Sequence, residues 1–205
     1  MTGLSPPLQT ALLWALWCFL HSFLITRWWT GVVFALLGER FAAGWYRVFF
    51  ISISLGTLMP VISHQFTLPQ IVLFTWPGWW AGVKIALSVY GLYMFYAGLR
   101  RYDMSFFLGL RQLRAYFTGV AVPRSAFTSD RIGGVRHPWY SGGIALVWAA
   151  GPLTDVTLAR NLVISVYFVI GAFLEERKLL AEIGAPYAEY RRELPMLFPW
   201  PRGRR

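Results

Sequence analysis

Charged residues are scarce in this sequence, and acidic residues are the scarcest of them. Only 14% of the chain is charged, whereas soluble globular domains carry about 25%. This shortage excludes an ordinary water-soluble domain, because too little charged surface remains to face water. Nine residues are acidic and 19 are Lys or Arg, which gives a formal net charge of +10. Because apolar runs separate the basic clusters, a membrane surface fits this charge better than nucleic acid does.

Cysteine and the motifs of several enzyme classes are also nearly absent. The single cysteine, Cys18, excludes an intrachain disulfide and is expected to pack within an apolar run. The three histidines lack the spacing of zinc ligands, so no metal site is predicted. No phosphate-binding loop or GxSxG nucleophile motif occurs. No basic residue precedes Arg27, so the first apolar stretch is expected to remain in the mature protein rather than to be a signal peptide.

Long apolar segments dominate what is present. A membrane-spanning helix requires about 20 mostly apolar residues, and five stretches approach that length. These predicted spans are residues 8–26, 45–63, 79–99, 139–153 and 158–174. Aromatic residues make up 18% of the chain, which fits rings at the headgroup level of a bilayer. The sequence therefore predicts an all-α polytopic membrane protein with about five transmembrane helices in one domain, residues 1–205.

The basic residues lie on one side of these five spans. All Lys and Arg residues except Lys84 and Arg160 fall in three regions. These are the connection between the first two spans (residues 26–47), residues 100–138 and the tail 175–205. The positive-inside rule places that side in the cytoplasm. The amino terminus is therefore predicted outside and the carboxyl terminus in the cytoplasm. A bacterial inner membrane is expected, because no eukaryotic targeting signal occurs.

The densest polar motif is Gly133–Tyr140, just before the fourth span. Proline is favoured in the first turn of a helix, so Pro138 predicts that Arg136 and His137 lie at a positive helix end. Free backbone N–H groups and a guanidinium there suit an anion such as a carboxylate. A plain helix start with an interfacial arginine and aromatic residues explains the same motif.

Glu175 and Glu176 follow the fifth span. Its 17 residues reach about 26 Å, less than the roughly 30 Å hydrocarbon core. The two carboxylates are therefore predicted near the hydrocarbon boundary and at the negative end of a helix, where a cation must compensate them. Arg136, Arg177, Lys178 or a cationic ligand would serve. A solvated Glu–Arg cluster just outside the lipid is the alternative.

Two other basic and aromatic stretches have two interpretations each. Tyr187 and Tyr190 have the spacing of one helical face. They form either a cover over the ends of the last two spans or an interfacial anchor. The connection 100–134 is either a segment over a pocket mouth or a binding surface for anionic lipid.

Four motifs together resemble the isoprenylcysteine carboxyl methyltransferase and phospholipid methyltransferase superfamily over residues 131–200. They are Arg136-His137-Pro138-x-Tyr140, Glu175-Glu176, Gly184-x-x-Tyr187-x-x-Tyr190 and Leu197-Phe198-Pro199. The upstream motifs resemble its bacterial branch with methanethiol S-methyltransferase and nitrite-reduction-associated membrane proteins. These are His21-Ser22, Trp45-Tyr46-Arg47 and Gly109-Leu110-Arg111-Gln112-Leu113.

The resemblance implies that S-adenosylmethionine binds at the cytoplasmic end of the last two spans. Arg136 and His137 are the implied catalytic residues. The implied cofactor-binding residues are His137, Pro138, Tyr140, Glu175, Glu176, Tyr187 and Tyr190. Their chemistry agrees, because carboxylates accept bonds from ribose hydroxyls or an ammonium, and tyrosines and apolar groups can enclose an adenine.

The sequence therefore predicts an S-adenosylmethionine-dependent methyltransferase that acts on a small thiol or a lipophilic acceptor, with membrane lipid as a partner and no nucleic acid. One alternative is a non-enzymatic permease or an accessory protein of a nitrogen-oxide pathway, but the spans have few polar residues at mid-depth. Another is a methyltransferase for a phospholipid amine or a prenylcysteine carboxylate. No sequence feature indicates an oligomeric state.

Overall fold

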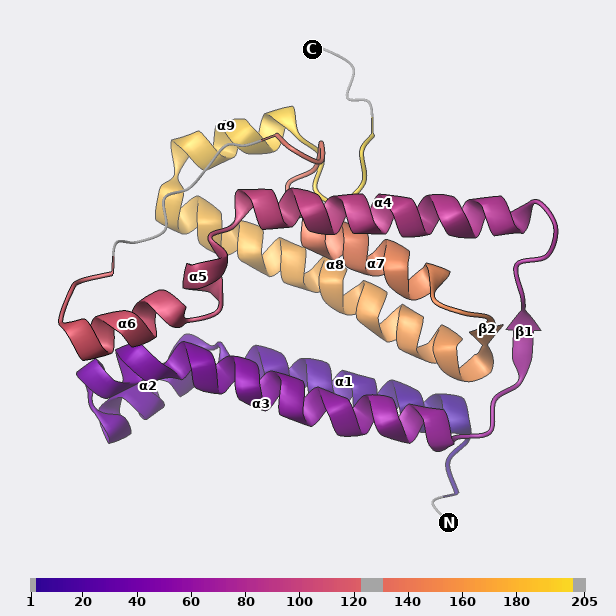
Figure 1. Cartoon of the computed structure of the whole chain (residues 1–205), viewed down its shortest axis with the longest axis horizontal. Coiled ribbons are helices and arrows are strands. Elements are labelled where there is room, and N and C mark those ends of the chain that lie inside the picture. The colour runs from indigo at the N-terminus through magenta and orange to yellow at the C-terminus, as the bar shows by residue number, and fades with distance from the viewer. Residues whose placement is uncertain (1–2, 123–130, 201–205) are drawn as a thin grey trace. The chain divides into compact units, whose positions relative to one another are not determined.

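A computed structural model of the chain describes residues 3–122 and 131–200 (Figure 1). Apart from two short strands, the regular structure of these residues is helical. The chain divides into two compact units, one of Met1–Pro69 with Tyr102–Ala126, the other of Gln70–Arg101 with Phe127–Arg205. The predicted all-α fold class is confirmed. The prediction of a single domain stays a prediction.

The first unit is built around one long helix, α3. Its helices are α1 (Pro6–Leu24), α2 (Arg27–Leu37), α3 (Glu39–Thr67), α5 (Met104–Phe107) and α6 (Leu110–Thr118). Helices α1, α2 and α6 each pack against α3. Polar contacts fix the α1–α3 pair, because the indole of Trp14 donates to Gln65 Oε1 at 3.0 Å and both residues are buried.

The second unit contains the remaining elements of the chain. They are β1 (Val72–Phe74), α4 (Trp80–Arg101), α7 (Pro138–Ala149), β2 (Leu153–Thr154), α8 (Asp155–Ile183) and α9 (Ala185–Glu193). Helix α7 packs against both α4 and α8, and α9 packs against α8 (Figure 1). The strands β1 and β2 form an antiparallel pair. The turn at Gly151 and Pro152 therefore makes α7 and α8 an antiparallel pair of neighbours, as the sequence predicts.

Local sequence signals explain where α7 and α8 begin and where α8 ends. Pro138 occupies the first turn of α7, where its missing N–H costs no hydrogen bond. Thr154 and Thr157 form a reciprocal cap at the start of α8. Helix α8 ends at Gly184, whose φ of 73° is a left-handed conformation that favours glycine.

Glycines allow α4 and α7 to approach closely. A Cβ atom added at Gly142 of α7 would lie 2.8 Å from the carbonyl oxygen of Gly91 in α4. Small residues of this kind favour close helix contact in a bilayer. A hydrogen bond of 2.6 Å between the hydroxyls of Tyr90 and Ser141 joins the same two helices. This packing fixes the start of α7, and with it Arg136 and His137.

Four described helices, α1, α3, α4 and α8, are long and apolar enough to cross a membrane. The polytopic membrane class is thereby supported, but the fourth predicted span forms only α7, whose 12 residues reach about 18 Å. The apolar surface of the second unit fits a lipid environment. On α4, Ile85, Val89 and Leu92 are each at least 60% exposed. The predicted orientation of the termini stays a prediction.

Helix α8 has 29 residues and continues to Ile183, beyond Leu174, where the fifth membrane span was predicted to end. Glu175 and Glu176 therefore lie inside the helix, and the prediction that they sit at its negative end is wrong. Helix-favouring Glu, Arg, Lys and Leu residues continue the helix until Gly184 interrupts it.

The α4–α7 contact predicts the effect of one added methyl group. In Gly142→Ala, the new Cβ meets backbone rather than a movable side chain, so we expect a loss of about 1–3 kcal/mol of stability. Gly82→Ala in α4 is the matched control, because a Cβ there meets open space. Thermal unfolding in detergent measures both variants. Equal stability of the two variants would contradict the close approach of α4 and α7.

Candidate functional site

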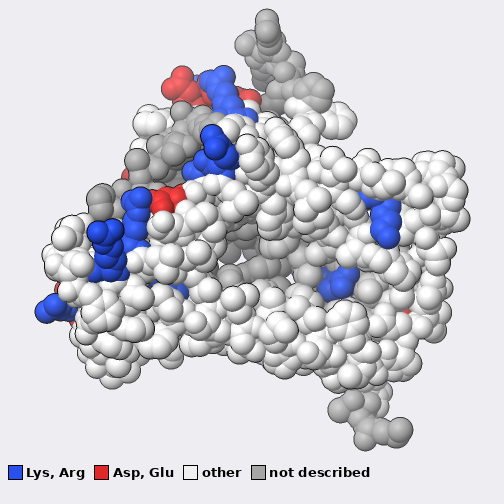
Figure 2. Space-filling view, viewed as in Figure 1, with Lys and Arg blue, Asp and Glu red and all other residues white. Residues whose placement is uncertain are grey.

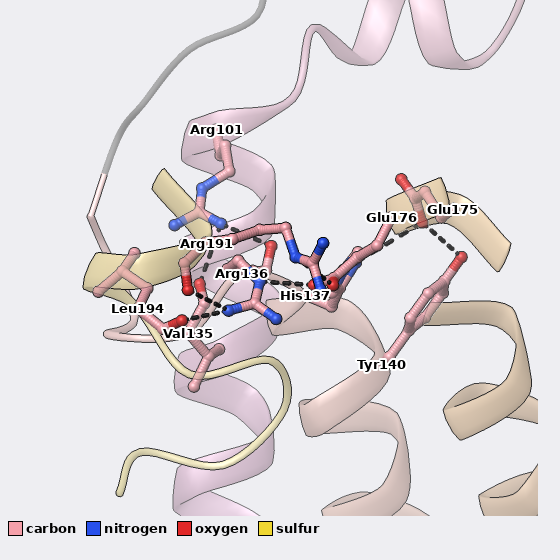
Figure 3. Close-up of polar contacts among 9 residues, drawn as sticks. All are labelled: Arg101, Val135, Arg136, His137, Tyr140, Glu175, Glu176, Arg191 and Leu194. Carbon is pink, nitrogen blue, oxygen red and sulfur yellow. Dashed lines mark hydrogen bonds and ion pairs between the residues drawn. The ribbon is translucent and has the colours of Figure 1, made fainter. Parts of the chain in front are cut away.

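The predicted site residues of the last two spans converge within the second unit. Arg136 and His137 immediately precede α7, while Glu175 and Glu176 lie on the facing helix α8. Figure 3 shows Arg136 and His137 beside Glu176, with Arg191 of α9 approaching the same carboxylate and Tyr140 reaching Glu175. The α7–α8 turn thus brings together residues that lie about 40 positions apart in the sequence.

A buried ion pair between Arg136 and Glu176 lies at the centre of this cluster. The Nε atom of Arg136 donates to Oε1 of Glu176 at 2.5 Å, and the side chains are only 5% and 3% exposed. The Nη1 atom of Arg136 also donates to the backbone carbonyls of Arg191, at 3.0 Å, and Leu194. These partners compensate the desolvation of a buried guanidinium.

Both oxygens of Glu176 are engaged. Oε1 also lies 3.3 Å from Nε2 of His137, and Oε2 forms an ion pair with Nε of Arg191 at 3.0 Å. Arg136 and Arg191 are therefore the compensating cations of this carboxylate. Lys178, which the sequence also offered for that role, pairs instead with Glu182 at 4.0 Å.

Glu175 has a different environment from Glu176. Its Oε2 accepts a hydrogen bond of 2.9 Å from the Tyr140 hydroxyl and lies 3.6 Å from Nδ1 of His137. Its side chain is 34% exposed, and its Oε1 accepts no hydrogen bond from the part of the chain that the structure describes. Glu175 therefore keeps one carboxylate oxygen for a ligand, whereas each oxygen of Glu176 already has a partner.

His137 lies between the two carboxylates and is buried. Its ring stacks on Tyr140 with centroids 5.5 Å apart. Burial lowers the pKa of the imidazole, but hydrogen bonds with Glu175 and Glu176 and their negative charges raise it more. The net pKa is therefore raised above 6.5. The protonated imidazole is thus favoured between two carboxylates.

The backbone around Arg136 and His137 is paired with the end of the described chain. The N–H of Arg136 donates to the carbonyl of Pro195 at 2.9 Å, and that of His137 donates to the carbonyl of Met196 at 3.1 Å. These two N–H groups are therefore not available to bind an anion, and the predicted anion site at the start of α7 stays a prediction for the other groups there. The Leu-Phe-Pro motif that follows places Leu197 in the core with Ile144 and Ala172.

Arg101, at the end of α4, belongs to the cluster although the sequence analysis counted it only among the basic residues. Its guanidinium donates to the carbonyls of Ile132, Val135 and Arg136 at distances of 2.8 to 3.1 Å. Arg101 therefore fixes the loop that presents His137. The sequence carried no signal for this role, because three backbone carbonyls of a distant loop are the acceptors.

Tyr187 and Tyr190 of α9 are buried, at 2% and 4% exposure, with ring centroids 6.0 Å apart. Burial raises the pKa of Tyr187, and the charge of Glu176 adds to the increase. A buried pair fits a segment that covers the ends of α7 and α8 better than an interfacial anchor. Their contact with a cofactor stays a prediction.

An open cavity of about 550 Å³ lies along α8 and α9 beside the cluster. It is lined by Ile170, Phe173, Leu174, Glu176, Arg177, Leu180 and Arg191. One part of the lining is apolar and the other is charged. In Figure 2, charged side chains gather over α9, whereas the surface along α4 shows few of them.

Curated proteins named methanethiol S-methyltransferase are similar to this chain. The protein named methanethiol S-methyltransferase 2 from Bradyrhizobium diazoefficiens is 32% identical over 120 residues, which are 58% of this chain and 46% of that protein. One from Mycobacterium tuberculosis is 29% identical over 144 residues, 70% of this chain and 55% of that protein. Methanethiol S-methyltransferase 1 from Bradyrhizobium diazoefficiens is 37% identical over 95 residues, 46% and 33% of the two chains.

The similarity confirms the resemblance to the bacterial methanethiol S-methyltransferase branch that the sequence motifs predict. The chain spans about half the length, or less, of the curated relatives that it matches. No protein-family model matches the chain, and no solved structure matches it. The fold and the site therefore rest on the structure described above.

The environments of the two glutamates predict opposite effects of the same substitution. Glu176→Gln leaves the buried charge of Arg136 without its counter-ion, so we expect a loss of about 3–5 kcal/mol of stability. Glu175→Gln keeps an acceptor for Tyr140 and is expected to cost much less. Thermal unfolding of both variants in detergent provides the comparison. Equal losses would show that Arg136 and Glu176 are not paired in the folded protein.

His137 predicts a pH dependence of stability. Because its pKa is raised in the folded protein, the stabilisation is complete below 6.5 and is lost as the pH rises through the folded-state pKa. We expect the melting temperature of the wild type to fall over this range. His137→Gln should show a smaller fall, since glutamine does not titrate. An identical pH profile for both proteins would refute the assignment of a raised pKa to His137.

Proposed function

We propose that this chain is an integral-membrane methyltransferase that transfers a methyl group from S-adenosylmethionine to a small thiol. The observation that carries the proposal is the buried cluster of Arg136, His137 and Glu176 beside an open cavity. The similarity to proteins named methanethiol S-methyltransferase supports the reaction class and the acceptor class.

The residues present fit such a methyl donor. The cavity volume of about 550 Å³ lies within the range of about 300–1,000 Å³ usual for small-molecule sites. Glu175, with one oxygen unengaged by the described residues, would accept hydrogen bonds from an ammonium or from ribose hydroxyls. Tyr140 and His137 would position that carboxylate, which belongs to the cluster beside the cavity and not to the cavity lining. The buried Tyr187 and Tyr190 would support the donor site from α9.

The donor supplies an activated methyl group on a positively charged sulfur, so the protein needs to add little covalent chemistry. Its tasks are to orient the acceptor, hold it near the methyl group and exclude water. We assign Arg136 a positioning role, because its guanidinium is directed to Glu176 and to two backbone carbonyls. His137, which lies between the two carboxylates and whose pKa is raised by them, would keep the orientation of Glu175 fixed.

We place the protein in a bacterial cytoplasmic membrane as a multi-pass protein. Four apolar helices and the bacterial source of the similar proteins support this location. The one-sided distribution of Lys and Arg supports a cytoplasmic site, with the amino terminus outside. Membrane lipid is then the partner of the exposed apolar helix faces.

A methyl-transfer assay tests the reaction and the acceptor class together. Protein purified in detergent is incubated with S-adenosylmethionine labelled in its methyl group and with a short alkyl thiol, a phospholipid amine or a prenylcysteine. We expect label to appear in the thioether product of the thiol. Transfer only to an amine or a carboxylate would overturn the thiol assignment, and no transfer to any class would overturn the proposed activity.

Binding of S-adenosylhomocysteine tests the proposed donor site separately from turnover. We expect Glu175→Gln to weaken binding at least tenfold, because a carboxylate binds an ammonium more strongly than an amide does. Glu182→Gln, about two turns further along the same helix and in contact with Lys178 rather than with the cluster, is the control with the same loss of charge. Calorimetry measures both affinities. Unchanged affinity in Glu175→Gln would remove this residue from the donor site.

A further inference from the structure

The cavity contains a stripe of one face of α8 that is apolar except for one cation. Its members occupy positions i, i+3, i+4 and i+7 of the helix, which lie on the same side. They are Ile170, Phe173, Leu174 and Arg177. The three apolar members are each more than 50% exposed. The stripe therefore offers an apolar wall that ends in a guanidinium.

Arg177 differs from the other arginines around the cluster. The charge of Arg191 is compensated by Glu176 at 3.0 Å, and that of Arg136 by the same carboxylate at 2.5 Å. Arg177 makes no ion pair or hydrogen bond with any residue that the structure describes. Its positive charge is thus the one in the described cavity lining that no carboxylate compensates.

We infer that Arg177 binds the sulfur of the methyl acceptor as a thiolate, which makes short alkyl thiols the preferred substrate class. This inference rests on the proposed methyltransferase function. A guanidinium beside a thiol favours the deprotonated form, because it interacts with the thiolate and not with the neutral thiol. The apolar wall formed by Phe173 and Leu174 receives the alkyl group. An ammonium-bearing acceptor would be repelled by Arg177.

The carboxylate of the donor is the anion that competes with a thiolate for Arg177. In S-adenosylmethionine that carboxylate lies next to the ammonium, which we assign to Glu175. Successive residues of a helix point about 100° apart, so Glu175 and Arg177 point to nearly opposite sides of α8, and Glu175 is absent from the cavity lining. A thiolate has no second group to place, so the cavity fits it better than it fits the donor carboxylate.

The reaction balances without a further reactant. The thiol first loses its proton to water. A lone pair of the thiolate sulfur then forms the new bond to the methyl carbon. The bond between that carbon and the donor sulfur breaks, and its electron pair stays on the donor sulfur. The products are a neutral methyl thioether and S-adenosylhomocysteine, and Arg177 keeps its charge throughout.

The test compares Arg177→Gln, Arg177→Lys and Lys178→Gln in the full-length protein with methanethiol as acceptor. Lys178 is the matched control, because it is adjacent in sequence, exposed and absent from the cavity lining. We expect Arg177→Gln to lower kcat/KM for the thiol at least tenfold near neutral pH. Its kcat profile should also shift to higher pH, since bound thiol then ionises less readily. Arg177→Lys should recover much of the activity, and Lys178→Gln should resemble the wild type.

Calorimetry with S-adenosylhomocysteine, for each variant, identifies the source of the bound anion. Unchanged affinity in Arg177→Gln supports the thiolate assignment. A tenfold weaker affinity with an unchanged KM for the thiol would overturn it in favour of the donor carboxylate. Equal losses in Arg177→Gln and Lys178→Gln, present in anionic but not in zwitterionic lipid nanodiscs, would overturn it in favour of a lipid headgroup. An inactive wild type would instead refute the proposed function itself.

Discussion

The buried ion pair between Arg136 and Glu176 is the interaction on which the rest of the site depends. It joins the start of α7 to the last third of α8, and the additional bonds of Arg136 to backbone carbonyls bring in the end of α9 and the residue that follows it. A buried ion pair stabilises a fold only when hydrogen bonds and opposite charges compensate the desolvation of both groups. Because Arg191 and His137 complete the set around Glu176, a break at any member exposes the others to an unpaired charge.

Close packing of α4 on α7 supplies the rigid base for this ion pair. The glycines at positions 91 and 142 let the two backbones approach, and Arg101 at the end of α4 then reaches the carbonyls of the loop before α7. In lipid, where apolar burial contributes little to helix association, such close contact and hydrogen bonds between helices are the main stabilising terms. The base and the site are therefore parts of one packing arrangement.

Residue types and spacing predicted much of this, and the reasons for the failures are physical. Pro138 and the turn at Gly151 predicted the start of α7 and its neighbour α8 correctly, because both signals act locally. The placement of the two glutamates at a helix end was wrong, because a drop in hydrophobicity at Glu175 marks the end of an apolar span and not the end of a helix. Arg101 was missed because its partners are backbone carbonyls, which no side-chain pattern reveals.

The division of work between the two adjacent glutamates follows from helix geometry. Successive residues on a helix point about 100° apart, so Glu176 turns inward to Arg136 while Glu175 turns to Tyr140 and remains a third exposed. The next residue, Arg177, turns further and reaches the cavity stripe. Three consecutive charged residues thus face three surroundings: a buried counter-ion, a partly open polar network and an apolar wall. Glu176 can therefore serve as a structural charge, Glu175 as a ligand acceptor and Arg177 as an anion-binding cation within a single turn of α8. They can differ in role because their side chains point in different directions from the helix.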